Sequence, residues 1–183
     1  PFVPEDAPDF AILIELEANA ATKYSKLDLQ EALNGFLEDQ FELTIVNAAL
    51  GNAQELWHLR HSISEGARAL GKPIAFDVSV PRSRIMEFCR QGRALVARDY
   101  PFLTVVDFGH IADGGVHFNV IWRKDAAEPY DPAVVQRLRD AIYTMVVQDF
   151  GGSYSAEHGV GPHNMAYYRQ FTPELLQQWA DGW

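Results

Sequence analysis

The sequence predicts an α+β fold, in which an antiparallel or mixed sheet carries its helices on one face in a ferredoxin-like style. Two observations lead to this prediction. Strand-like apolar stretches alternate with stretches of helical spacing in the order β-α-β-α-β-α-β-β-α-β-α. Two neighbouring strands are joined by a short glycine-rich turn, which is typical of an antiparallel hairpin. The length of 183 residues suits one domain with a substantial core.

The first half of the chain alternates strands with helices. The predicted elements are a strand at 10–16, a helix at 28–40, a strand at 43–47, a helix at 52–70 and a strand at 74–80. Asn52 is a good N-cap for the long helix, and Gly71 is a typical helix stop. Residues 74–80 alternate between core-facing and outward positions, as a half-buried strand does.

The second half contains the hairpin and the remaining helices. The predicted elements are a helix at 81–100, strands at 102–111 and 116–122, a helix at 131–150, a strand at 153–156, and two short helical stretches before residue 183. Asp131 and Pro132 form an N-cap followed by a first-turn proline. The single cysteine, Cys89, excludes an internal disulfide and has the helical surroundings of a buried small hydrophobe.

Composition excludes several classes of partner. A net charge of −10 argues against binding to nucleic acid or to an anionic membrane. No apolar stretch approaches the roughly 20 residues of a membrane span, and no signal peptide opens the sequence. We therefore expect a cytoplasmic protein, or one peripheral to the inner membrane. Residues 1–9, PFVPEDAPD, have the composition of a linker, so we expect the chain to be part of a longer protein.

The hairpin GHIADGGVHFNV carries an unusual set of polar residues. A two-residue loop at 113–114, or a four-residue loop at 112–115, would place His110 directly opposite His117, close enough for both to bind one ion. Asn119 would then point to the same face. A loop at 114–115 would instead pair His110 with Asn119. The alternative is that these are ordinary polar residues on the solvent face of the hairpin.

A second motif, GGSYSAEHGVG, offers a third ligand. Glu157 supplies the anionic oxygen that a transition ion bound by two histidines would need, and glycines around it allow unusual backbone angles. His158 is suited to act as a general base. Read alone, this stretch is equally compatible with a glycine-rich surface loop.

Both motifs resemble those of the FAD-linked D-2-hydroxyacid dehydrogenases, a group that includes D-lactate and D-2-hydroxyglutarate dehydrogenases and the glycolate oxidase flavin subunit. The hairpin is similar to H-x-G-D-G-N-x-H-x-N, and GSYSAEHGVG to G-x-I-S-G-E-H-G-I-G. ELWHLRHSISEGA and FDVSVPRSRIMEF resemble two further family motifs, in the same order. The resemblance covers about residues 10–170. It implies that 10–183 is the C-terminal substrate-binding or cap domain of a flavin oxidase, and that an N-terminal FAD-binding domain is missing.

The resemblance also implies roles for individual residues. His110, His117 and Glu157 match metal ligands that commonly hold zinc, and His158 matches the base that takes the hydroxyl proton as hydride passes to the flavin. The remaining matches are an arginine that clamps the substrate carboxylate and two residues that line the pocket, namely Arg60, Ser64 and Asn119. Ala75 departs from the pattern, because hydroxyglutarate-type enzymes carry a lysine there for the second carboxylate.

Three functions follow from these observations. The leading hypothesis is the substrate-binding, metal-carrying domain of an FAD-dependent D-2-hydroxyacid oxidoreductase, with FAD held mainly by the missing domain and this chain inactive by itself. Its partners are then a small 2-hydroxy acid and the FAD domain, and an exposed interdomain face would allow a homodimer. The second is a flavin-independent hydrolase or lyase that uses the His/His/Glu metal site. The third is a non-catalytic regulatory or oligomerisation module.

Overall fold

The computed structural model describes residues 12–41, 45, 47–110 and 112–182. The chain divides into two compact units, Pro1–Ser62 and Ile63–Trp183. Within the described ranges there are eight α-helices and a four-stranded sheet, which confirms the predicted α+β class. None of these helices is long and apolar enough to cross a membrane. The linker predicted at 1–9 lies outside the described residues.

The first unit contains three helices, α1 (Ala20–Ser25), α2 (Leu29–Gln40) and α3 (Ala53–His61). The predicted N-cap Asn52 is confirmed, since its side chain accepts a hydrogen bond from the first turn of α3, and Asp28 caps α2 in the same way. No residue of these three helices is buried. The caps at Asp28 and Asn52 are therefore the local signals that mark where α2 and α3 begin.

The two strands predicted in this unit have different outcomes. The strand at 10–16 is wrong for residues 12–16, which are exposed and lie in no strand. An apolar run becomes a strand only when another strand pairs with it, and the described part of this unit supplies none. The strand at 43–47 falls largely outside the described residues. Ile45 makes an isolated parallel bridge with Phe41.

The helix predicted at 52–70 is interrupted. Ser62 separates α3 from α4 (Ile63–Leu70). Its hydroxyl donates a hydrogen bond of 2.7 Å to the His58 carbonyl oxygen, which also accepts the Ser62 backbone N–H at 2.9 Å. A serine hydroxyl that bonds four residues back in this way competes with regular helix hydrogen bonding. The break therefore has a local cause that apolar spacing does not reveal.

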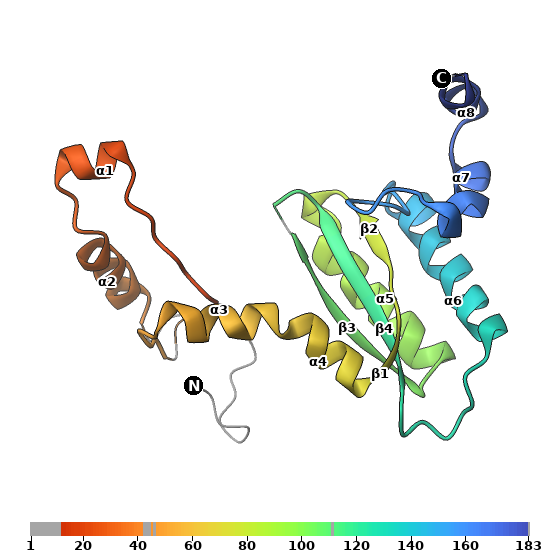
Figure 1. Cartoon of the computed structure of the whole chain (residues 1–183), viewed down its shortest axis with the longest axis horizontal. Helices are drawn as coiled ribbons and strands as arrows, with labels where there is room; N and C mark the ends of the chain where they lie inside the picture. Colours follow the sequence, from red (N-terminus) through yellow and green to blue (C-terminus); the bar gives the residue numbers. More distant parts are fainter. Residues whose placement is uncertain (1–11, 42–44, 46, 111, 183) are drawn as a thin grey trace. The chain divides into compact units, whose positions relative to one another are not determined.

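The sheet belongs to the second unit and is antiparallel throughout. Its strands are β1 (Gly71–Ile74), β2 (Asp77–Ser79), β3 (Leu103–His110) and β4 (Gly115–Arg123). β4 is central, with β3 along one edge and both β1 and β2 along the other (Figure 1). β1 and β2 continue one register against β4. The strand predicted at 74–80 covers all of β2 but only the last residue of β1, Ile74.

The remaining helical segments all follow β2 in the chain. They are η2 (Arg82–Arg84), α5 (Ile85–Asp99), α6 (Pro132–Thr144), the π-helical η3 (Met145–Asp149), η4 (Pro162–Asn164), α7 (Met165–Phe171) and α8 (Glu174–Asp181). The predicted N-cap Asp131 is confirmed, because its carboxylate accepts the Ala133 N–H. The strand predicted at 153–156 is reduced to a single antiparallel bridge between Ser153 and Ser79.

The core lies between one face of the sheet and helices α5 and α6. The even-numbered residues of β4 point into it, and the main cluster also includes the following buried side chains from the other strands and helices: Ile74, Phe76, Val78, Phe88, Leu138, Ile142 and Val146. Cys89 is buried there, as predicted. Burial, with a hydrogen bond to Asp107 as the next cause, raises the pKa of its thiol to about 12, so the thiol stays protonated and packs as a small hydrophobe.

Phe118 is the centre of this packing and gives a stability prediction. Its ring is fully buried, lies 5.4 Å from that of Phe88, and occupies the space that a Cβ on Gly92 would need. We expect Phe118→Ala to lower the free energy of unfolding by about 3–5 kcal/mol. The substitution leaves a cavity beside Gly92, which has no side chain to move into it. Urea denaturation measures this. Met86→Ala, at a position 66% exposed on α5, should change stability by less than about 0.5 kcal/mol, and equal losses would contradict the prediction.

Candidate metal and substrate site

The hairpin of β3 and β4 places His110 and His117 on one face of the sheet, but not in the predicted register. His110 lies opposite Gly115, and His117 lies opposite Phe108. The predicted direct pairing of the two histidines is therefore wrong by two residues. Because side chains alternate with a period of two, a shift of two keeps both imidazoles on the same face. The histidines become diagonal neighbours, with ring centroids 5.6 Å apart.

The turn explains the shift. The Asp113 carboxylate accepts the Gly115 backbone N–H at 2.9 Å, and the Asp113 N–H donates to the His110 carbonyl oxygen at 3.1 Å. These bonds keep Asp113 inside the loop and make Gly115 the first residue of β4. Gly114 has a φ of 90°, and a Cβ there would lie 2.6 Å from the Val80 carbonyl oxygen. β3 therefore ends at His110 and β4 begins at Gly115.

The loop that carries Glu157 and His158 is held against the edge of β2. Ser153 and Ser79 exchange two backbone hydrogen bonds, and the Ala156 N–H donates to the Asp77 carbonyl oxygen at 3.1 Å. Gly152 allows this close approach, since a Cβ there would overlap the Ser79 carbonyl oxygen. Gly159 has a φ of 70°, as the glycine pattern predicted. The loop therefore delivers Glu157 to the face that carries the two histidines.

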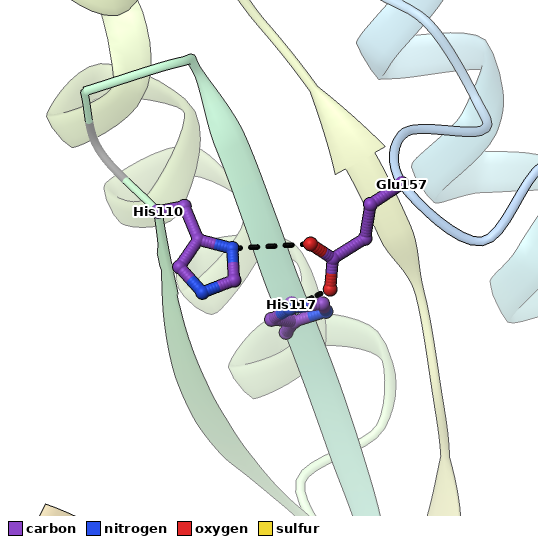
Figure 2. A group of neighbouring side chains, drawn as sticks. All are labelled: His110, His117 and Glu157. Carbon is purple, nitrogen blue, oxygen red and sulfur yellow. Dashed lines mark ion pairs between the residues drawn. The ribbon is translucent and has the colours of Figure 1, made fainter.

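Glu157 joins both histidines through its two carboxylate oxygens. Oε2 lies 3.2 Å from Nδ1 of His110, and Oε1 lies 3.0 Å from Nε2 of His117 (Figure 2). His117 is only 15% exposed, whereas Glu157 is 48% exposed. The cluster is thus anchored at His117 and open to solvent at Glu157.

The three side chains fit a divalent ion. One donor atom from each of His110, His117 and Glu157 lies within 4.8 Å of the other two. Ligand atoms about 2.1 Å from one tetrahedral ion lie roughly 3.4 Å apart. The two nitrogen–oxygen distances are close to this value, although each ends on a different oxygen of Glu157. Two imidazoles and one carboxylate also form a zinc ligand set that leaves a fourth position open. The same contacts are also ion pairs when the imidazoles are protonated, and measured metal binding distinguishes the two states.

His158 lies beside this ligand group. Its ring stacks on that of His117, with centroids 5.4 Å apart and an interplanar angle of 29°. Its Nε2 lies 3.6 Å from Oε1 of Glu157, and its side chain is 67% exposed. An accessible imidazole next to an open metal position is placed to exchange a proton with a bound molecule.

Asp77 is part of the same cluster and was not predicted from the sequence. Its carboxylate, 13% exposed, lies 3.5 Å from Nδ1 of His117 and 3.5 Å from Nδ1 of His158. The sequence did contain one signal for a functional role, because Asp77 is an acidic residue within the mostly apolar stretch 74–80. The pairing of β2 with β4 that brings it to His117 is a long-range contact.

Of the three residues predicted to bind substrate, Asn119 and Ser64 belong to the same unit as this cluster, and Arg60 belongs to the other unit. Asn119 follows His117 by two on β4, is half-buried on the same face, and donates a long hydrogen bond of 3.5 Å to the His117 carbonyl oxygen. Arg60 is exposed on α3 in the first unit, and Ser64 is exposed on α4 in the second. The structure thus brings together His110, His117, Glu157 and His158, with Asn119 on their face.

Comparison with protein families gives one match over nearly the whole chain. The family described as FAD linked oxidases, C-terminal domain, matches residues 2–179. This range includes both units and every residue of the cluster.

Individual relatives carry related names. A D-2-hydroxyglutarate dehydrogenase of Xanthomonas citri pv. viticola is 37% identical over 123 residues, 67% of this chain and 26% of the relative. One of Stutzerimonas stutzeri is 32% identical over 160 residues, 85% of this chain and 33% of the relative. A Schizosaccharomyces pombe protein, named as a candidate mitochondrial D-lactate dehydrogenase, is 26% identical over 171 residues, 86% of this chain and 30% of the relative. The chain thus spans about a third or less of each relative's length.

Proposed function

The chain belongs to the family of FAD-linked oxidases, as their C-terminal domain, and on that premise we propose that it is the substrate-binding, metal-carrying domain of a flavin-dependent D-2-hydroxyacid dehydrogenase. The observation that carries this proposal is the His110–His117–Glu157 cluster with His158 beside it. A separate flavin-binding domain would hold FAD and accept the hydride.

The roles of the side chains follow from their chemistry. His110, His117 and Glu157 would hold a divalent ion, and we propose zinc, for which two histidines and one carboxylate form a known catalytic ligand set. The bound ion would supply Lewis-acid polarisation of the substrate hydroxyl. His158 would accept the hydroxyl proton while the hydride on the same carbon leaves for the flavin, so that the 2-hydroxy acid becomes a 2-oxo acid. Arg60 would pair with the substrate carboxylate through its guanidinium fork, and Ser64 and Asn119 would line the pocket.

The substrate is proposed to be a D-2-hydroxy acid without a second carboxylate. Several relatives are named as D-2-hydroxyglutarate dehydrogenases, but Ala75 stands where the hydroxyglutarate-type pattern has a lysine. An exposed methyl group cannot pair with a distal carboxylate. Monocarboxylic substrates such as D-lactate are therefore expected to be turned over more efficiently than D-2-hydroxyglutarate.

The test is turnover by protein that contains this domain together with the proposed flavin-binding domain. A panel of D-2-hydroxy acids, each with its L enantiomer as control, is offered with a dye as electron acceptor. Dye reduction with the D acids is the expected result. No turnover with any acid would contradict the proposal. A colourless protein with metal-dependent hydrolase or lyase activity would favour the flavin-independent alternative that uses the same three ligands.

A further inference from the structure

Asp77 reaches two functional side chains with one carboxylate. It lies in β2 directly opposite His117 of β4, so the register fixes both residues on the same face. It is also among the least exposed charged groups of the cluster, at 13%. A carboxylate this far removed from water needs polar partners to offset the loss of hydration.

One oxygen of Asp77 faces the ligand His117. Oδ1 lies 3.5 Å from Nδ1 of His117, while Nε2 of the same ring lies 3.0 Å from Glu157. The two ring nitrogens therefore face opposite partners, with Nδ1 toward Asp77 and Nε2 toward the metal ligand group. A carboxylate behind a ligand histidine sets the ring orientation and favours the tautomer whose Nε2 lone pair is free to bind an ion.

The other oxygen of Asp77 holds the turn that carries His158. Oδ2 accepts the His158 backbone N–H at 2.7 Å and lies 3.5 Å from its Nδ1. The Asp77 carbonyl oxygen accepts the Ala156 N–H at 3.1 Å. Residues 156–158 are thus fastened to β2 at two points, and Glu157 lies between them. The position of the carboxylate therefore affects the third ligand as well as the base.

We propose that Asp77 is a positioning residue that sets the metal ligand His117 and the base His158 in their working orientation through one carboxylate. This inference rests on the function proposed above. This role depends on the position of both carboxylate oxygens, because Oδ1 faces His117 and Oδ2 faces His158. Asparagine offers one oxygen and one NH2 group, so it can accept from the His117 side or from the His158 N–H, but not from both.

The test is metal binding by the chain itself, measured as zinc competition against a chromophoric chelator and as the visible spectrum of bound cobalt(II). Asp77→Asn should bind zinc about 10–100-fold more weakly, with an altered cobalt spectrum, because the ligand set is no longer held in place. Asp125→Asn is the matched control, since it removes a carboxylate that pairs with Arg123 at 2.7 Å and is 68% exposed. It should bind as the unaltered chain does.

A second variant separates position from charge. Asp77→Glu keeps the charge and both oxygens but moves them by one methylene, so positioning predicts weakened binding here too. Wild-type affinity and spectrum in either Asp77 variant, with circular dichroism showing a folded chain, would overturn the inference and leave the proposed function standing. Absence of stoichiometric zinc or cobalt in the unaltered chain would overturn the proposed metal site itself. The two failures are therefore distinguishable.

Discussion

Replacing His117 with alanine is expected to abolish tight binding of a divalent ion by this chain. His117 is the most buried of the three proposed ligands, and its Nε2 lies 3.0 Å from the Glu157 carboxylate. Its loss leaves one imidazole and one carboxylate, both about half-exposed. We expect the zinc affinity to fall by more than about 100-fold, beyond the effect of disturbing an outer-shell partner. Elemental analysis of chain purified without chelators or a histidine tag should find about one ion in the unaltered protein and none in the variant.

The control for this prediction is another histidine. His58 is exposed on α3 and lies 3.3 Å from the Ser62 hydroxyl through Nε2. His58 and His61, in the sequence H-L-R-H, are spaced like a pair of metal ligands on a helix. His61 instead stacks on Trp57, so we read both histidines as surface residues. His58→Ala should retain the ion. Equal metal content in the two variants would show that the ion, if present, is bound elsewhere.

The metal group was predictable because it depends on local geometry. Side chains alternate between the two faces of a strand, so a register shift of two residues leaves each side chain on its original face. The predicted register was wrong by two residues, and His110 and His117 therefore still lie on one face. Glu157 was identified by its chemistry and its glycine neighbours rather than by a contact. Its delivery depends on the bridge between Ser79 and Ser153, which residue spacing does not encode.

The parts of the fold that the sequence missed are those decided by a distant partner or by one hydrogen bond. The strand prediction at 74–80 found β2 and the end of β1, because the alternation of Ile74, Phe76 and Val78 reflects burial on one face. Residues 12–16 are as apolar but have no described strand beside them. The break at Ser62 coincides with one side-chain hydrogen bond, from the Ser62 hydroxyl to the His58 carbonyl oxygen. Asp77 was missed because the β2–β4 pairing joins residues far apart in the chain.

The prediction with the clearest mechanistic content concerns His158. His158→Gln should lower kcat for a D-2-hydroxy acid by about 10²–10⁴-fold, the range that general base catalysis contributes. Glutamine has similar length but cannot accept the hydroxyl proton. KM should change much less, because the proposed carboxylate clamp is Arg60. The measurement is steady-state turnover in protein that includes the proposed flavin-binding domain, with metal content determined in the same sample.

The metal content decides what a slow variant means. Nε2 of His158 lies 3.6 Å from Oε1 of Glu157, so the alternative role of this imidazole is that of a fourth metal ligand. If His158 is the base, His158→Gln should have a low kcat and keep the ion. If His158 is a metal ligand, the variant should lose both turnover and the ion. His163→Gln is the matched control, since His163 is exposed in η4 five residues further along the same segment, and it should leave both unchanged. Unaltered kcat in His158→Gln would exclude His158 as the base and leave the hydroxyl proton to another acceptor.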